Sequence, residues 1–121
     1  MSLLLGLDVG TTSIKAVVYR PDGIAVASAA AATPTHVPRP RWAYYRADEL
    51  WGTVVDVIQR AIAQLDDPGR IISVAVASVA EAGVLLDARG EATADVIAWY
   101  DTRTKPQSDW SDSMARRTSA R

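Results

Sequence analysis

The sequence predicts an α/β domain, in which a mixed sheet opens with three antiparallel strands and carries helices packed on it. Three apolar runs of strand length, separated by two short turns, occupy residues 3–32, which is typical of consecutive β-hairpins. A helical period follows over residues 50–65, and an unbroken apolar run then covers residues 71–79. Hairpins followed by a helical crossover give a mixed sheet, whereas a plain doubly wound fold would alternate strand and helix from the start.

Composition limits the classes of protein to consider. The 121 residues are enough for one domain with a buried core, and the formal net charge of −1 argues against a dedicated nucleic-acid binder. The chain has no cysteine, which excludes a disulfide framework and a thiolate zinc site. No apolar run reaches membrane-spanning length, and the opening run is too short for a signal peptide. We therefore expect a cytoplasmic protein that binds neither nucleic acid nor membrane.

The first two strands form a hairpin that runs from Leu3 to Tyr19 and turns at residues 10–13. A second turn signal, Pro21-Asp22-Gly23, leads into a third strand from Ile24 to Ala32. Alanine dominates this third segment, so its propensity alone would also suit a helix. The short turn before it favours antiparallel pairing, and we predict a strand.

The next segment, Thr33 to Arg41, holds three prolines and no apolar periodicity, and it predicts a surface loop that contains the single histidine, His36. We expect the aromatic run at residues 42–45 to pack over the helix that follows. Apolar residues at helical spacing predict that helix from Leu50 to Leu65, with two acidic residues just before it that favour its N-terminus. The sequence at residues 66–69 ends it, because proline cannot continue a helix.

The second half of the chain predicts shorter elements. The apolar run from Ile71 to Val79 is typical of a strand covered on both faces. Gly83 to Leu86 suggests another strand that ends in a turn at residues 87–90, and Val96 to Trp99 is a short apolar segment. From Lys105 onward the tail suggests a helix with an apolar stripe of Trp110 and Met114.

The first cluster with chemical potential lies where the first strand ends. Asp8 could bind Mg²⁺ directly or through water, or it could simply cap the turn by accepting backbone N–H bonds. The turn could hold phosphate oxygens through its amides and hydroxyls, although it contains no P-loop pattern. Lys15 is either a phosphate neighbour or an outward-facing strand residue. The turn itself consists of Gly10, Thr11, Thr12 and Ser13.

The second cluster combines a carboxylate with an aromatic segment. Glu81 follows the apolar strand at a place suited to receive ligand hydroxyls, or it is a solvent-facing loop residue. Trp99 offers a flat face for the C–H side of a sugar, while Asp101 and Arg103 could accept and donate hydrogen bonds to its hydroxyls. The alternative is that Trp99 is core and that Asp101 and Arg103 pair at the surface.

With both clusters in place, the chain resembles the FGGY family of carbohydrate kinases. Four segments match in the right order: GLDVGTTSIKAVVY resembles the phosphate-binding hairpin, WAYYRADELW the loop and helix start, VAVASVAEAGVLLD the strand and substrate loop, and IAWYDTR the next substrate segment. The hairpin alone recurs across the actin-like ATPase superfamily, so the ordered combination carries the resemblance. It spans nearly the whole chain.

The resemblance implies an actin-like ATPase (ribonuclease H-like) fold and transfer of the ATP γ-phosphoryl group to a sugar or polyol hydroxyl, with ATP and Mg²⁺ as cofactors. In this family Asp8 would serve the metal and phosphate end, the turn from Gly10 to Ser13 would lie at the γ-phosphate, and Lys15 would lie near the nucleotide. Glu81 and Trp99 would line the substrate pocket. Asp101 and Arg103 match the polar residues of the W-x-D-x-R form found in sugar-kinase branches.

Family members are several times longer than this chain, and they hold the aspartate base and the adenosine-binding domain further along. We therefore expect residues 1–121 to be the N-terminal part of the first kinase domain, inactive alone, of a longer protein that could form a homodimer. Two other interpretations stay open, a stand-alone sugar- or phosphate-binding module and a non-catalytic actin-like assembly domain. The loop at residues 78–80 lacks both the polar residues of glycerol kinases and the histidine of xylulokinases, so it favours neither substrate.

Overall fold

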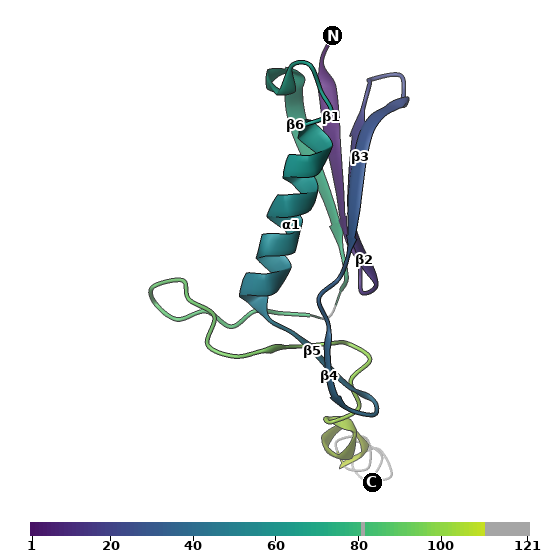
Figure 1. Ribbon diagram of the computed structural model, residues 1–121. Coiled ribbons are helices and arrows are strands. Elements are labelled where there is room, and N and C mark those ends of the chain that lie inside the picture. Colours follow the sequence, from purple (N-terminus) through teal and green to yellow (C-terminus); the bar gives the residue numbers. More distant parts are fainter. Residues whose placement is uncertain (81, 111–121) are drawn as a thin grey trace, which may run out of the picture.

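The computed structural model describes residues 1–80 and 82–110, and it places them in two sheets and a long helix (Figure 1). The larger sheet has the strand order β3-β2-β1-β6 and the helix α1 lies across one of its faces. The smaller sheet, with the order β4-β5-β7, lies beyond the N-terminal end of α1. The strands of the larger sheet are β1 (Leu3–Val9), β2 (Ser13–Tyr19), β3 (Ala25–Ala32) and β6 (Ile71–Ser78).

The three opening strands are antiparallel, which confirms the prediction of a sheet that begins with two hairpins. The turn between β2 and β3 has Gly23 at a φ of 86°, a left-handed conformation that suits glycine. The alanine-rich segment is a strand because it pairs with β2 along its whole length, from Tyr19 against Ala25 to Ser13 against Ala32. Pairing with a neighbour thus overrides the helix propensity of alanine.

Strand β6 pairs in parallel with β1 and forms an edge of the described sheet. The prediction that this strand is covered on both faces is wrong for the described residues. Val74 and Val76 pair with Leu5 and Leu7 and so lie on the face of the sheet that carries α1, yet they remain 56% and 62% exposed. The reason is that α1 packs on β2 and β3, which are two and three strands away from this edge.

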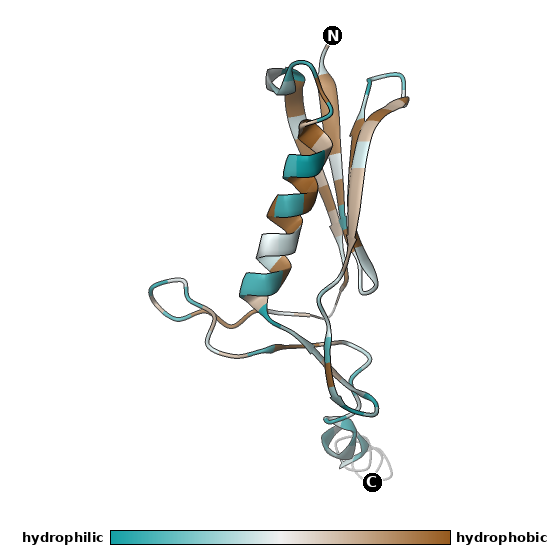
Figure 2. Cartoon of the chain, in the orientation of Figure 1, coloured by the Kyte–Doolittle hydropathy of each residue, from teal (hydrophilic) through white to brown (hydrophobic). Residues whose placement is uncertain are grey.

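Helix α1 (Ala47–Ile62) begins three residues before the predicted start and ends three residues before the predicted end. Its apolar face points to the sheet and its polar face to solvent (Figure 2). Acidic residues stand in its first turn, as expected, but Arg46 at the N-cap provides no side-chain hydrogen bond. The main core lies between α1 and the sheet, and it consists of Leu3, Leu5, Leu7, Ile14, Ala16, Val18, Ala27, Val54, Val57 and Ala61.

Part of the surface loop predicted between β3 and α1 belongs to the smaller sheet. Strands β4 (His36–Arg39) and β5 (Trp42–Tyr45) form a hairpin, and β7 (Val96–Ile97) pairs with the other side of β5. The loop prediction rested on three prolines and the lack of apolar periodicity, whereas an edge strand such as β4 tolerates its proline, Pro38. The aromatic run at residues 42–45, which was expected to pack over the helix, forms strand β5. Arg41, at a φ of 66°, closes the tight turn.

Between β6 and β7 the chain is mostly irregular. The strand predicted from Gly83 to Leu86 is wrong, because only an isolated bridge between Leu86 and Ala92 is present. The turn at residues 87–90 is confirmed, with Gly90 at a φ of 82°. Residues 105–110 are helical, as predicted, while Met114 lies outside the described residues.

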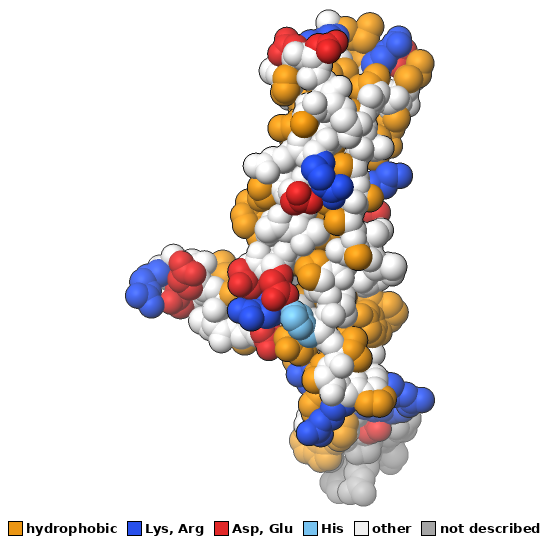
Figure 3. Space-filling model, viewed as in Figure 1, with side chains coloured by type: hydrophobic (Ala, Val, Ile, Leu, Met, Phe, Trp, Pro, Cys, Tyr) orange, Lys and Arg blue, Asp and Glu red, His pale blue; other side chains and the backbone are white. Residues whose placement is uncertain are grey.

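Charged side chains of both signs are intermixed on the face that Figure 3 shows. That distribution agrees with the net charge of −1 and gives that face no continuous basic surface for nucleic acid. No helix among the described residues is both long enough and apolar enough to span a membrane.

Candidate functional site

The turn between β1 and β2 is braced from both sides. The Gly10 amide donates to the Ser13 carbonyl at 3.0 Å, and Thr33 donates its hydroxyl to the Gly10 carbonyl at 2.7 Å and its amide to the Thr12 carbonyl at 3.0 Å. The amides of Thr11 and Thr12 donate to no other described residue. The turn is therefore rigid and presents two free N–H donors, which suits the binding of an anion.

Asp8 is exposed and lies directly opposite Lys15 in the β1–β2 ladder. Its carboxylate accepts no hydrogen bond and forms no ion pair with another described residue. The alternative in which Asp8 caps the turn is therefore wrong. Both side chains lie on the face of the sheet away from α1, where they line a hollow of about 410 Å³ floored by small residues such as Gly6, Ala75 and Ala77.

The parallel pairing of β1 and β6 brings the segment after β6 next to this turn. The Val79 amide donates to the Val9 carbonyl at 3.0 Å and so extends the ladder past the end of β6. A small cavity of about 140 Å³ is lined by Gly10, Ser78 and Ala82 together with Tyr45 of β5. The structure therefore places the turn at residues 10–13 beside Ser78, Val79 and Ala82, which flank position 81 in the sequence. Glu81 itself lies outside the described residues.

Trp99 and Tyr100 form the exposed tip of a β-turn. The turn closes with a bond from the Asp101 amide to the Ala98 carbonyl at 2.9 Å, and the two aromatic side chains are 58% and 40% exposed. Their rings meet edge to face, with centroids 5.7 Å apart. The alternative in which Trp99 belongs to the core is wrong, because its neighbours Ala98 and Asp101 are the buried residues of this turn.

Asp101 and Arg103 form an inward-facing pair. The Asp101 side chain has no exposed surface and Arg103 is 26% exposed, so the alternative in which the two residues pair at the surface is wrong. Arg103 donates from Nε to Oδ1 at 3.0 Å and from Nη2 to Oδ2 at 2.9 Å. These charge-assisted bonds lower the pKa of Asp101 to about 2. The guanidinium also lies over the Trp42 ring, 4.8 Å from its centroid.

Three residues near these clusters were not singled out by sequence reasoning. Thr33 braces the turn at residues 10–13, and its place between an alanine run and a proline gave no sequence signal of this role. Tyr100 shares the exposed tip with Trp99. Tyr45 is 2% exposed, and its hydroxyl has no hydrogen-bond partner among the described residues. Burial, together with the neighbouring Tyr100 side chain, raises the pKa of Tyr45 to about 12.

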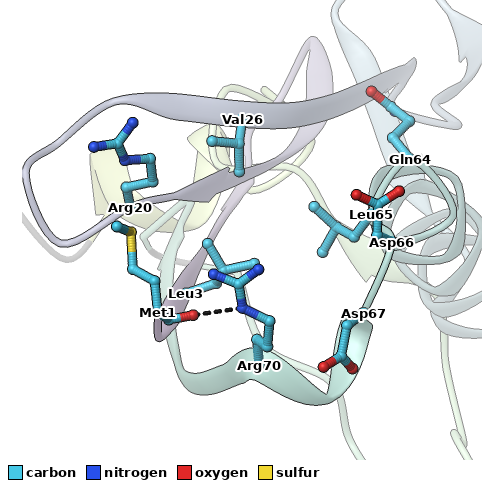
Figure 4. Close-up of a pocket in the computed structure, with 9 residues that line it drawn as sticks. All are labelled: Met1, Leu3, Arg20, Val26, Gln64, Leu65, Asp66, Asp67 and Arg70. Carbon is cyan, nitrogen blue, oxygen red and sulfur yellow. Dashed lines mark hydrogen bonds between the residues drawn. The ribbon is translucent and has the colours of Figure 1, made fainter.

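Another hollow, of about 360 Å³, lies at the opposite end of the sheet, where β1 begins and α1 ends (Figure 4). Arg70 extends into it and donates from Nε to the Met1 carbonyl at 2.6 Å, which ties the N-terminus to the start of β6. Acidic side chains of Asp66 and Asp67 share its wall with Arg20 and Arg70. The mixed charges and the distance from the Asp8 turn separate this hollow from the candidate site.

Comparison with known proteins decides the family. Residues 3–119 match the profile described as "FGGY family of carbohydrate kinases, N-terminal domain". The chain belongs to this FGGY family. It is 36% identical over 106 residues to a glycerol kinase of Bradyrhizobium diazoefficiens and 34% identical over 104 residues to one of Methylobacterium nodulans. These matches cover 86% and 84% of the chain but only 21% of each relative, so the chain spans about a fifth of the length of these curated relatives.

Solved structures of FGGY kinases agree with the fold. Gluconate kinase from Lactobacillus acidophilus superposes with a TM-score of 0.82 at 26% identity, over 95% of this chain and 23% of that one. Xylulose kinase from Rhodospirillum rubrum superposes with a TM-score of 0.75 at 30% identity, over 84% of this chain and 21% of that one. These likenesses confirm the mixed α/β sheet and the actin-like fold that the resemblance implied.

Proposed function

We propose that this chain is the N-terminal part of the first domain of a carbohydrate kinase, which transfers the γ-phosphoryl group of ATP to a hydroxyl of a sugar or polyol. The observation that carries the proposal is the placement of the Asp8 carboxylate beside a braced turn, in a chain whose family phosphorylates carbohydrates; within the described residues, neither this carboxylate nor the amides of Thr11 and Thr12 have a partner. The chain spans a fifth of its relatives, and the proposal concerns the longer protein.

At the phosphate end, the amides and hydroxyls of Thr11 and Thr12 would hold the γ-phosphoryl oxygens, with the hydroxyl of Ser13 beside them. Gly10 lets the turn close tightly, since a Cβ at this position would lie 2.9 Å from the Ser13 carbonyl oxygen. Lys15, exposed on the same sheet face as Asp8, would add positive charge near the nucleotide. Such groups act by fixing the phosphoryl group in line and by balancing its charge.

Mg²⁺ fits this site through one protein carboxylate. Within residues 1–80 and 82–110, no group of three or more His, Cys, Asp or Glu side chains could hold a metal ion by itself. Mg²⁺ commonly uses one or two carboxylates, water and substrate phosphates, and the exposed Asp8 meets that need directly or through water. When bound, the ion would neutralise charge on the phosphates.

At the substrate end, Glu81 and Trp99 are the proposed contacts for the acceptor, with Arg103 nearby. The carboxylate would accept hydrogen bonds from acceptor hydroxyls, and the exposed indole would cover the C–H face of the sugar. The relatives act, by their names, on glycerol, xylulose and gluconate, and these compounds form the first acceptor panel. We also propose a cytoplasmic location, where ATP is available.

The test uses the full-length product of the gene that encodes this chain. ADP release is measured with each acceptor, for the wild type, for Asp8→Asn and for the control Asp56→Asn, which changes an exposed carboxylate on α1. Asp8→Asn should lower kcat by about 100-fold or more, since removal of one charge-stabilising group at a reacting centre has effects of this size. Asp56→Asn should keep the wild-type rate.

Unchanged phosphorylation by Asp8→Asn would overturn the role of this carboxylate. A wild type that phosphorylates no acceptor would overturn the kinase proposal. The alternative function is then a sugar- or phosphate-binding module, which the free amides of the turn favour within the described residues, or an actin-like assembly domain. Binding of inorganic phosphate or of the sugar panel without turnover would support the module.

A further inference from the structure

The tip formed by Trp99 and Tyr100 is fastened at both ends to one residue of β5. The Ala98 amide donates to the Ala43 carbonyl at 3.0 Å, and the Ala43 amide donates to Asp101 Oδ2 at 2.6 Å. The first bond continues the pairing of β5 with β7. In the second, the Asp101 carboxylate takes the place that a backbone carbonyl of a neighbouring strand would occupy.

Both oxygens of Asp101 are used inside the protein. Oδ1 accepts from the Arg103 amide at 2.7 Å and from Arg103 Nε, while Oδ2 accepts from Arg103 Nη2 and from the Ala43 amide. The side chain has no exposed surface. A carboxylate that accepts four hydrogen bonds and lies out of reach of solvent has no capacity left for a ligand hydroxyl.

The Arg103 guanidinium, which Asp101 holds, stacks on Trp42 of the β4–β5 hairpin. Arg103 lies 4.8 Å and Arg39 lies 5.0 Å from the Trp42 ring centroid, so the indole contacts cations from β4 and from the segment after the tip. The Thr102 amide adds a bond of 3.0 Å to the Arg41 carbonyl. Residues 101–103 are therefore fixed to the β4–β5 hairpin at several points, while the two residues before them face outward.

We propose that Asp101 is a positioning residue, which fixes the Trp99–Tyr100 tip so that these two aromatic side chains contact the acceptor. This inference rests on the proposed function and changes the role of Asp101 from ligand contact to support. It adds Tyr100 to the acceptor site, where its phenol would bond to an acceptor hydroxyl and its ring would stand at 89° to the Trp99 indole. An aromatic corner of this kind fits a sugar or polyol, which offers apolar C–H groups and hydroxyls together.

The kinetic test is a mutant cycle in the full-length gene product. Asp101→Asn keeps an acceptor oxygen but puts an NH₂ group toward the donors of Ala43 and Arg103, which should turn the tip. We expect the KM for the acceptor to rise roughly 10-fold, the factor for loss of an aromatic contact, with kcat and the KM for ATP unchanged. In a background with Trp99→Ala and Tyr100→Ala, Asp101→Asn should have no further effect on the acceptor KM.

A spectroscopic measurement on the 121-residue chain gives a readout that does not need turnover. The near-UV circular dichroism band that disappears in Trp99→Leu is the signal of the paired rings. The spectrum of Asp101→Asn should lack the same band, while its far-UV spectrum stays unchanged. The matched control is Asp87→Asn. Asp87 also precedes an arginine by two residues and accepts from the Arg89 and Glu91 amides, but it lies in a turn that protrudes away from the tip (Figure 1).

Each outcome decides the proposal. If Asp101→Asn raises the acceptor KM by the same factor in the wild type and in the background with Trp99→Ala and Tyr100→Ala, Asp101 touches the acceptor directly and the proposal is wrong. If the variant lowers only thermal stability, with KM and the near-UV band unchanged, the residue is merely structural and the proposal is again wrong. A wild type without kinase activity would remove the proposed function, and the near-UV band would still decide whether Asp101 positions the tip.

Discussion

Replacing Tyr45 by phenylalanine removes a single buried hydroxyl and leaves the ring in place. Tyr45 is 2% exposed, and its oxygen has no hydrogen-bond partner among the described residues. Burying such a group without a partner costs about 1–3 kcal/mol. We expect Tyr45→Phe to raise the free energy of unfolding by about 1 kcal/mol at pH 7, the lower end of that range. For a chain of this size the gain corresponds to an increase in Tm of about 3–5 °C.

The same substitution should change how stability depends on pH. The pKa of Tyr45 is about 12 in the folded chain, against an ordinary value of 10.0, so the unfolded chain releases this proton first. The contribution of this proton to the stability of the wild type is therefore fully present below pH 10, and it decreases as the pH rises toward 12. Tyr45→Phe removes this contribution, and its advantage over the wild type should grow in that window.

The assay is urea denaturation of the wild type, Tyr45→Phe and the control Tyr44→Phe at pH 7 and pH 11. Tyr44 is the preceding residue in β5 but is only half-buried and stacks on His36, with ring centroids 4.9 Å apart. Its substitution should change stability little at either pH. A Tyr45→Phe variant that is less stable than the wild type would refute the reasoning, because its hydroxyl would then have a partner that it loses.

Two further substitutions test the start of α1 and the phosphate turn. Arg46→Ser creates a Ser-Ala-Asp-Glu capping box at the start of α1. In thermal denaturation, this variant should be more stable than Arg46→Ala by about 1 kcal/mol. Equal stability of the two variants would contradict the capping argument. Gly10→Ala should destabilise by about 1–3 kcal/mol, because its Cβ would lie 2.9 Å from the Ser13 carbonyl oxygen, whereas Gly6→Ala meets its nearest atom at 3.5 Å and should be tolerated. Equal denaturation midpoints for the two glycine variants would show that the turn relaxes freely.

Local sequence signals were enough for the first part of the fold. The turn residues around Gly23 and the apolar runs on either side indicate the three antiparallel strands, and the acidic residues of its first turn mark the start of α1. The state of β6 could not be predicted in the same way. Its residues are apolar throughout, but the burial of Val74 depends on what packs beside it, and within the described residues β1 is the only strand next to it.

The residue types of the candidate site could be predicted from the sequence, but the directions in which their side chains face could not. The spacing of Asp101 and Arg103 indicated a polar pair, but only the fold shows that this pair points inward onto Ala43 and Trp42. The opposite holds for Asp8, for which sequence alone left capping and ligand binding equally open, and its carboxylate has no partner in the part of the chain that the structure describes. Tyr100 was missed because an aromatic residue next to Trp99 gives no separate signal of exposure.

The attachment of both ends of the tip to Ala43 limits how this part of the molecule can diversify. A residue inserted between Ala98 and Asp101 would bulge outward between two points held on Ala43, and it would break the bond from the Asp101 amide to the Ala98 carbonyl that closes the β-turn. Loop lengthening, a common route to new specificity at an exposed turn, would thus cost the tip its closed geometry. Exchange of the side chains at positions 99 and 100 changes the exposed surface and leaves both bonds to Ala43 in place.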